Sequence, residues 1–452
     1  MALSLFPNER QLGLLTDLYE LTMAAGYHVH GLADQVVTFE LWVRRLPDER
    51  NYLVAGGLEQ AVHYLQHLSF SPEQIDYLRT HAAFQTVPAD WFDRLAGLRF
   101  DGELWAVPEG TVVFGGEPLL RVTGPLLVSQ IIETYLITTI TMQTLVASKA
   151  ARVVTAAQGR PVVDFGSRRA HGPQAGLLAA RAAFLAGCTG TSNTEAGRLL
   201  GIPTLGTQAH AWIMAFGDEI DAFRKFGQVF PRTSTLLIDT YDTVQGVRNA
   251  LRSGAPMQAV RLDSGDLKAL SKQVRGILDA AGRQDVKIVA SGDLNEYKVR
   301  DLLAAGSPID VFGVGTELVT SRDEPTLGTV YKLVEQHTPQ GVVGRFKLSR
   351  AKKTYPYAKQ VFRESAADGT FRGDVIARAT ESLPGEPLLV PVLKGGQLVR
   401  PLPALCDIQA RCKDQLARLP PVLLELTKAP PYPVRVSAAL EAEAQRLAQE
   451  QC

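Results

Sequence analysis

Apolar and polar positions follow a repeating pattern between residues 161 and 316. Short apolar runs that end in Gly, Asp, Ser or Thr alternate with helical segments, and the runs begin at Pro161, Pro203, Thr235, Gln258, Val286 and Ile309. After Asp266 the apolar residues are spaced by threes and fours, which is the period of an amphipathic helix. Alternating strands and helices predict a parallel sheet covered by helices, either a closed α/β barrel or a doubly wound sheet.

The pattern outside this region predicts a mixed α/β structure. We expect helices at residues 11–26, 57–68 and 128–157 and from Ser437 onward, with Thr16 as the cap of the first. Strands are expected at 37–43 and within 102–125, and a hairpin at Gly395-Gly396. The C-terminal β-rich part is expected to pack with the N-terminal one. The resulting segments are an N-terminal α/β domain at 1–127, a catalytic barrel at 128–335 and a C-terminal segment at 336–452.

The composition is that of a globular protein without an overall electrostatic preference. The 452 residues are 46% hydrophobic and 21% charged, and 47 Lys and Arg balance 47 Asp and Glu. No net field therefore favours nucleic acid or a membrane surface, and any anion site must be local. The most apolar long segment, residues 126–154, contains Gln130, Glu133 and Lys149, so we expect a buried helix and no membrane span.

Cysteine usage and the N-terminus bear on the compartment. The four cysteines lack CxxC spacing and are too few for a disulfide framework in a chain of this length. The first ten residues lack the basic and apolar regions of a signal peptide. We therefore expect a reduced, cytoplasmic protein.

A histidine lies at the centre of the stretch with the most evident chemistry, residues 201–216. The sequence predicts a short strand that ends at Gly206-Thr207 and turns directly into a helix. His210 would lie in the first turn of that helix, where unpaired amides and the helix dipole favour anions. It would serve there as a phosphate acceptor or a general base, and the alternative is a histidine that only caps or packs at the turn.

Polar residues gather where the other predicted strands end, the edge at which parallel α/β proteins carry their sites. Arg168 and Arg261 can bind anionic groups bidentately. Two glycine-rich strand ends can present backbone amides to phosphate, and three carboxylates can hold Mg²⁺ or sugar hydroxyls. The amide set is Ser291, Gly292, Asp293, Gly313, Gly315 and Thr316, and the carboxylates are Asp239, Asp263 and Asp293. Together they suit a phosphorylated sugar that carries a pyrophosphate.

Several motifs, in order along the chain, resemble those of the nicotinate phosphoribosyltransferase family. They are Thr16-Asp-Leu-Tyr-Glu-Leu-Thr-Met, Phe165-Gly-Ser-Arg-Arg-Ala-His-Gly, Gly201-Ile-Pro-Thr-Leu-Gly-Thr-Gln-Ala-His, Ile238-Asp-Thr-Tyr-Asp-Thr, Val260-Arg-Leu-Asp-Ser-Gly-Asp-Leu, Ser291-Gly-Asp-Leu and Phe312-Gly-Val-Gly-Thr. The resemblance implies an irregular parallel α/β barrel with a second mixed α/β domain built from both termini. It also implies a homodimer that joins nicotinate to 5-phosphoribosyl 1-pyrophosphate (PRPP), with Mg²⁺ and with ATP hydrolysis coupled to the step.

The same resemblance implies roles for particular residues. His210 would be phosphorylated by ATP, Thr207 and Arg261 would contact nicotinate, and Thr316 would bind PRPP. Tyr19 would reach nicotinate from the partner subunit. From the chemistry, Phe165 and Tyr19 can stack on the two ring faces, because the attacking nitrogen lone pair lies in the ring plane. The basic cluster at residues 347–353 would contact ATP or pyrophosphate, or form a solvated basic face.

Other functions remain to be weighed. A nicotinamide-specific relative shares the fold and the histidine, but an uncharged amide needs no extra cation. A decarboxylating enzyme that uses quinolinate would need a denser basic pocket and would not need His210. A non-catalytic nucleotide-binding homologue would have lost His210, Arg261 or the glycine loops, and a metal hydrolase is disfavoured because no His/Asp cluster has ligand spacing.

Overall fold

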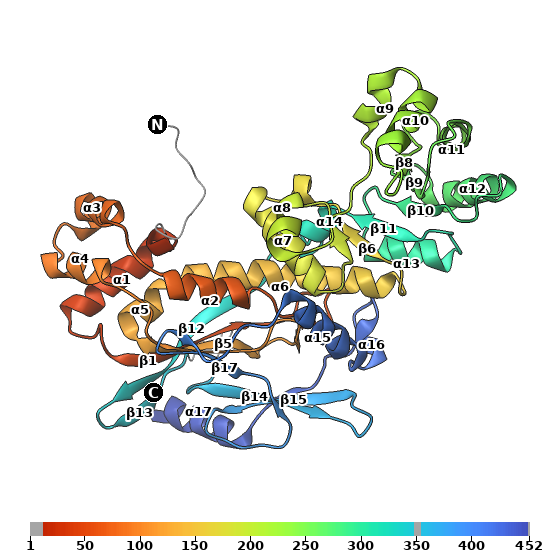
Figure 1. Cartoon of the computed structure of the whole chain (residues 1–452). Coiled ribbons are helices and arrows are strands. Elements are labelled where there is room, and N and C mark those ends of the chain that lie inside the picture. Colours follow the sequence, from red (N-terminus) through yellow and green to blue (C-terminus); the bar gives the residue numbers. More distant parts are fainter. Residues whose placement is uncertain (1–11, 348–353, 451–452) are drawn as a thin grey trace. The chain divides into compact units, whose positions relative to one another are not determined.

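The computed structural model describes residues 12–347 and 354–450 of the chain. These residues form two compact units, which Figure 1 colours along the sequence. The terminal unit consists of Met1–Thr144 and Thr326–Cys452, and the central unit is Leu145–Pro325. The boundary between the two units at Thr144 and Leu145 falls inside helix α6 (Glu133–Ala156). The sequence pattern had suggested boundaries after residues 127 and 335.

A seven-stranded sheet in the terminal unit interleaves strands from both ends of the chain. β1 is antiparallel to both β12 and β5, and β17 is antiparallel to β3. The β17–β18 hairpin turns through Gly395 and Gly396, both at positive φ, as the sequence predicts. The expected mixed α/β domain built from both termini is confirmed. The strand order is β13 (Gly341–Gly344), β12 (Thr329–Thr338), β1 (Val36–Val43), β5 (Pro118–Pro125), β3 (Glu103–Ala106), β17 (Val390–Lys394) and β18 (Gln397–Leu398).

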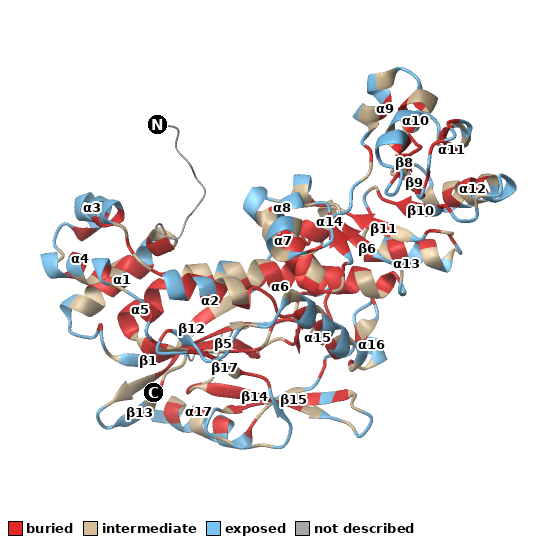
Figure 2. Ribbon diagram, in the orientation of Figure 1, coloured by how far each residue is buried: buried red, intermediate tan, exposed pale blue. Residues whose placement is uncertain are grey.

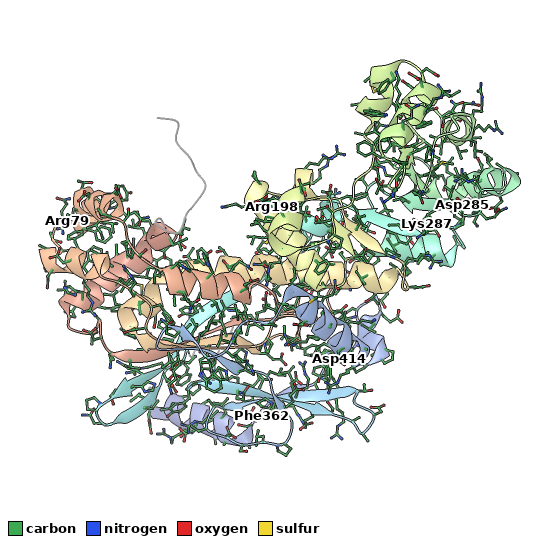
Figure 3. The ribbon with its side chains drawn as sticks, viewed as in Figure 1. Arg79, Arg198, Asp285, Lys287, Phe362 and Asp414 are labelled. Atoms are coloured by element: carbon green, nitrogen blue, oxygen red, sulfur yellow. The ribbon has the colours of Figure 1, made fainter. Side chains whose placement is uncertain are left out.

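Two smaller sheets and the terminal unit's helices complete this unit. One sheet has the order β16 (Glu386–Pro387), β14 (Lys359–Ser365), β15 (Phe371–Arg378) and β19 (Val434–Val436), and the other pairs β2 (Leu53–Val54) with β4 (Val112–Val113). Phe362 on β14, labelled in Figure 3, is buried. The helices are α1 (Leu18–Val29), α2 (Leu58–His67), α3 (Pro72–Thr80), α4 (Ala89–Ala96), α5 (Leu126–Ile131), α15 (Leu405–Ala417), α16 (Pro421–Leu424) and α17 (Ala438–Glu450).

Two helix predictions in the terminal unit need correction. Helix α1 starts at Leu18 with Asp17 in the N-cap position, so Thr16 is not the cap. The Thr16 hydroxyl instead makes hydrogen bonds to the Ile131 carbonyl, at 2.8 Å, and to the Glu20 carboxylate. The helical period does not encode the contact with Ile131, which is distant in the sequence. The predicted helix at 128–157 is two helices, α5 and α6, separated at Ile132. Among the described helices, none has both the length and the apolar character required to cross a bilayer.

The central unit is built on one parallel sheet of six strands. Its order is β7 (Gly190–Thr191), β6 (Val162–Asp164), β11 (Val311–Val314), β10 (Lys287–Ala290), β9 (Ala259–Leu262) and β8 (Thr235–Leu237), and every neighbouring pair is parallel. The strands are mostly buried and the outer faces of the helices are exposed (Figure 2). The sheet is curled into part of a barrel, which confirms the irregular parallel α/β barrel. The helices are α7 (Pro173–Leu185), α8 (Thr194–Leu200), α9 (His210–Phe216), α10 (Glu219–Val229), α11 (Thr243–Arg252), α12 (Leu267–Ala280), α13 (Glu296–Ala304) and α14 (Thr316–Val319).

One strand in the central unit differs from the prediction. The run at 203–207 forms no strand, because only Thr204 makes an isolated bridge, to Thr191. Proline at 203 has no backbone N–H to donate, and this weakens a ladder at that position. This segment is hydrogen-bonded through Pro203 and Leu205 to Thr191 of β7, the two-residue strand at the edge of the sheet, which has no apolar alternation that would reveal it.

Candidate active site

The carboxyl ends of the central unit's strands border a cavity of about 480 Å³. Because these ends meet at one edge of the sheet, residues far apart in the sequence converge there. Most of the predicted site residues line this cavity: Phe165, Arg168, Thr207, Arg261, Asp263, Ser291, Gly292, Asp293, Gly313, Gly315 and Thr316. The remaining wall is Ser167, Arg169, Ser192, Gly206, Gln208 and Ala209.

The aromatic wall of the cavity depends on a glycine in the neighbouring strand. Phe165 follows β6, and its backbone N–H donates to the Val314 carbonyl at 2.9 Å. Its ring lies directly against Gly313 of β11, where an added Cβ would be 2.4 Å from Phe165 Cδ2. Only glycine leaves room for the ring in this position. The other part of the half-exposed ring is available to a flat ligand.

Arg261 on β9 places a mostly buried cation in the cavity wall. Its Nη1 donates to Thr207 Oγ1 at 2.7 Å, and its Nη2 lies 3.8 Å from Asp263 Oδ2. Burial lowers the pKa of this guanidinium, while the Asp263 and Asp239 carboxylates act in the opposite direction. Its Nε is buried and has no hydrogen-bond partner among the described residues. The guanidinium is therefore held in place and keeps donor capacity for a bound anion.

Two carboxylates connect the ends of three adjacent strands. Asp239 Oδ2 accepts hydrogen bonds from the Asp263 backbone N–H at 2.9 Å and from Ser264 Oγ at 2.6 Å. Asp263 Oδ1 accepts from Ser291 Oγ at 2.5 Å. Asp239 Oδ1 is buried without a hydrogen-bond partner in the described chain. Over the same residues, no group of three or more His, Cys, Asp or Glu side chains is arranged to hold a metal.

The turn after β10 depends on a second glycine. Gly292 has φ +92°, and a Cβ there would lie 1.9 Å from the Asp263 carbonyl oxygen. The turn can therefore approach the end of β9 only with glycine. Asp293 follows at φ +50° and is exposed. Asp293 lies three residues before Glu296, a spacing typical of an acidic capping box, but it does not cap α13, because Asn295 Oδ1 accepts from the Lys298 N–H at 2.9 Å in that role.

His210 is the first residue of α9, as the sequence predicts. Its side chain is 42% exposed, its Nδ1 lies 3.2 Å from Thr240 Oγ1, and its Nε2 lies 3.8 Å from Asp263 Oδ2. The imidazole is thus oriented by a hydroxyl and a carboxylate and remains accessible. It does not line the cavity itself, but it contacts Asp263, which does.

Thr240 and Gln208 are among the residues of this site that were not singled out from the sequence. Thr240, which orients His210, lies inside the Ile238-Asp-Thr motif, and that motif was the only available signal. Gln208 is buried beside the cavity, and its Oε1 accepts from the Leu237 N–H at 3.3 Å. Neither role follows from local sequence, since both partners belong to another strand end.

Two other predicted groups belong to the terminal unit. Tyr19 is on α1 and is 48% exposed. It follows Leu18 and precedes Glu20, a fully buried carboxyl whose pKa burial raises to about 7. Of the basic cluster, Lys347 is described and its backbone N–H donates to Thr354 Oγ1. The other basic residues of that cluster, Arg350, Lys352 and Lys353, lie outside the described residues.

Three protein-family models match successive parts of the chain. Residues 14–141 match the nicotinate phosphoribosyltransferase N-terminal domain, and residues 383–442 match the nicotinate phosphoribosyltransferase C-terminal domain. Residues 146–323, nearly the whole central unit, match the quinolinate phosphoribosyl transferase C-terminal domain. The two terminal matches distinguish between the families, because the barrel match alone fits either kind of enzyme.

Two bacterial proteins and one human crystal structure resemble the chain along nearly its whole length. It is 45% identical over 442 residues to nicotinate phosphoribosyltransferase pncB2 of Mycobacterium tuberculosis, which covers 96% of this chain and 93% of that protein. Nicotinate phosphoribosyltransferase of Bacillus subtilis is 37% identical over 459 residues, with 94% and 93% covered. The crystal structure of human nicotinic acid phosphoribosyltransferase superposes with a TM-score of 0.84 at 30% identity, covering 96% of this chain and 100% of that one.

Proposed function

The chain belongs to the nicotinate phosphoribosyltransferase family, and on this premise we propose that it joins nicotinate to PRPP in NAD biosynthesis. The products are nicotinate mononucleotide and pyrophosphate. The observation that carries the proposal is the Arg261–Thr207 pair, a mostly buried guanidinium with donor capacity beside an aromatic ring. A carboxylate on a flat ring is the ligand chemistry that such a pair recognises.

In this site the chain's own residues orient the base. Phe165 supports one face of the pyridine ring, while Arg261 and Thr207 bind its carboxylate, with Arg168 on the same cavity wall. The ring nitrogen then attacks C1 of the ribose with its in-plane lone pair. The bond from C1 to the pyrophosphate oxygen breaks, and its electron pair leaves with pyrophosphate. A carboxylate near the ribose stabilises the positive charge that develops at C1.

The phosphorylated sugar is assigned to the two glycine-containing turns. Ser291–Asp293 and Gly313–Thr316 border the cavity and offer backbone amides to phosphate oxygens. Asp239 and Asp263 suit Mg²⁺, because they are oxygen donors and Asp239 Oδ1 is a buried acceptor without a partner in the described chain. Asp293, exposed at the same rim, is the third carboxylate assigned to Mg²⁺ or ribose. Mg²⁺, when bound, would neutralise charge on the leaving pyrophosphate.

ATP is assigned to His210, which is proposed to accept a phosphoryl group. The exposed imidazole and its contacts with Thr240 and Asp263 support this role. Phosphorylation would place additional negative charge beside Asp263 and would reorganise the hydrogen bonds around it. The histidine would thereby connect ATP hydrolysis to the occupancy of the cavity.

A homodimer with a shared active site is part of the proposal. Exposed apolar side chains on α1, namely Leu18, Tyr19, Met23 and Val29, form a surface that a second subunit would cover. Tyr19 would then contact nicotinate in the partner's cavity. Assignment to the reducing cytoplasm is supported by Cys406 and Cys412, which are free thiols in the described chain.

The test is product formation from PRPP and Mg²⁺ with nicotinate, nicotinamide or quinolinate, each with and without ATP. Wild type and His210→Ala are compared. We expect nicotinate mononucleotide from nicotinate alone, accelerated by ATP in the wild type only. The His210→Ala variant should keep the activity seen without ATP.

Each other outcome points elsewhere. Turnover of nicotinamide would indicate a nicotinamide-specific enzyme. Turnover of quinolinate would indicate the activity of the family whose model matches the central unit. If ATP accelerated the His210→Ala variant as much as wild type, the proposed phosphorylation of His210 would be contradicted. If no base gave a product, the remaining interpretation would be a non-catalytic nucleotide-binding homologue.

A further inference from the structure

A lysine at the centre of the central unit is completely buried and contacts three carboxylates. Lys149, on α6, has a side chain with 0% exposure. Its Nζ lies 2.6 Å from Glu296 Oε2, 2.9 Å from Asp323 Oδ1 and 3.6 Å from Glu317 Oε2. None of these four residues lines the cavity described above. The proposed mechanism therefore does not use them directly.

The carboxylates that Lys149 contacts belong to the segments that follow the two proposed phosphate turns in the sequence. Glu296 is the first residue of α13, immediately after the turn that contains Ser291–Asp293. Glu317 follows Thr316 directly in α14, and Asp323 lies in the segment just beyond that helix. One ammonium group thus connects both turns to α6.

The backbone alone connects these two turns only weakly. β10 and β11, the strands that precede them, are paired through two residue pairs, Val289 with Val311 and Ala290 with Phe312. Beyond these pairs each turn runs into its own helix. The relative position of the turns therefore also depends on what the two helices pack against, and Lys149 is a contact that they share.

Two arginines extend this cluster. The cations are Lys149, Arg152 and Arg322, whose Nη1 lies 3.5 Å from Glu317 Oε1, and the anions are Glu296, Glu317 and Asp323. Arg152 Nε binds the other oxygen of Glu296 at 3.0 Å, so Glu296 keeps a partner without Lys149. Loss of Lys149 would instead remove a buried cation from Glu317 and Asp323 on the α14 side. Removing one partner of a buried charge cluster is costly because the remaining charge stays desolvated.

We propose that Lys149 is a positioning residue that sets the spacing of the two phosphate-binding turns and so controls the affinity for PRPP. This rests on the proposed function, since it takes PRPP as the ligand of the turns. Nicotinate binding should depend on it less than PRPP binding does, because Arg261 and Thr207, the proposed ligands of the carboxylate, belong to neither turn.

The experiment compares wild type with Lys149→Met, which keeps the length of the side chain and removes its charge. We expect the KM for PRPP to rise about tenfold or more, because a small displacement of binding groups has an effect of this size. The KM for nicotinate should change less than twofold. Calorimetric binding of Mg²⁺-PRPP, measured without the base, should weaken by a similar factor. Lys149→Arg restores the charge and should recover part of the affinity.

Lys359→Met is the matched control. Lys359 is also a buried lysine paired with a buried glutamate, with Nζ 2.8 Å from Glu40 Oε2, but it belongs to the terminal unit. It should lower the melting temperature comparably without changing the KM for PRPP. If Lys149→Met does not fold, Glu317→Gln replaces it, since it removes one contacting charge at nearly constant shape and should also raise the KM for PRPP.

The outcomes separate the inference from the proposed function. An unchanged PRPP affinity in Lys149→Met and Glu317→Gln, or an equal rise in the KM for both substrates, would overturn the positioning role. A rise in the KM for PRPP in Lys359→Met would show a general effect of lost stability and overturn it as well. If wild type itself binds no Mg²⁺-PRPP, the proposed function fails first, and the inference fails with it.

Discussion

Single side chains in this protein acquire their chemistry from neighbours that are distant in sequence. Glu20 is an ordinary helical glutamate by its sequence, in the first turn of α1. In the structure it is fully buried and accepts a hydrogen bond from Thr134 Oγ1 at 2.8 Å. Burial raises the pKa of its carboxyl from 4.5 to about 7, although the hydroxyls of Thr16 and Thr134 partly oppose this.

This residue predicts a pH dependence of stability. The folded-state pKa of Glu20 is above the unfolded value, so its stabilising contribution is complete below about pH 4.5 and is lost as the pH rises through about 7. Glu20→Gln stays neutral and should lack this loss. We therefore expect the difference in melting temperature, variant minus wild type, to increase by a few degrees between pH 5 and pH 8.

Thermal unfolding at several pH values measures this difference. The exposed Glu425→Gln variant, which loses a solvated carboxylate, is the control and should track wild type across the range. A constant difference between Glu20→Gln and wild type would show that Glu20 titrates in the folded protein as it does in the unfolded chain.

At the scale of elements, the site is formed by turns whose backbone requires glycine. Gly313 on β11 makes room for Phe165 after β6, and Gly292 lets the turn after β10 approach the end of β9. These contacts join neighbouring strands at the rim of the cavity. The elements therefore determine the position of the aromatic wall and of the turn after β10 before any ligand binds.

Gly313→Ala tests this arrangement. A Cβ 2.4 Å from the Phe165 ring forces the ring to move, which should destabilise the protein by about 1–3 kcal/mol. The KM for nicotinate should rise several-fold, because the displaced ring enters the nicotinate position. Steady-state kinetics and thermal unfolding together measure both effects.

Gly276→Ala is the control for this substitution. Gly276 is in the exposed middle of α12, and an added Cβ there meets nothing within 4 Å. It should leave kinetics unchanged and stabilise the helix by about 0.5–1 kcal/mol. Normal nicotinate kinetics in Gly313→Ala would mean that Phe165 is not part of the base site.

At the scale of the whole molecule, the proposed shared site makes assembly a condition of activity. Tyr19 and Arg261 belong to different compact units, and the proposal places them in one site through two subunits. Co-expression of Tyr19→Ala and Arg261→Ala chains with different tags yields a heterodimer that distinguishes the arrangements. Its one site with Arg261 receives Tyr19 from the other subunit.

The purified heterodimer should therefore recover about half of the wild-type activity, since one of two symmetric sites is intact. Both parent homodimers should have much lower activity. If Tyr19 acted within its own chain, neither site of the heterodimer would be intact and its activity would stay at the level of the parents. A wild-type heterodimer with the same two tags is the control.

The sequence by itself determined the alternation of strands and helices, the parallel sheet and most of the cavity residues. Periodicity encodes burial within one element, and the polar residues after each apolar run have to gather at one edge of a parallel sheet. The motifs around Phe165 and Arg261 therefore supply residues that line one cavity, and His210 lies next to it through its contact with Asp263. The same local patterns failed at β7 and at 203–207, where short segments of Gly, Pro and Thr depend on pairing for their conformation.

Only the tertiary structure decided which side chains share a partner. The contact of His210 with Thr240, the unpartnered oxygen of Asp239, the burial of Glu20 and the three carboxylates around Lys149 all involve separate elements. Their chemistry depends on desolvation and on distances of a few ångströms, and these are set by packing across the whole fold. Sequence spacing carries no information about such distances, which is why the sequence did not indicate that a lysine in an apolar helix contacts the segments after β10 and β11.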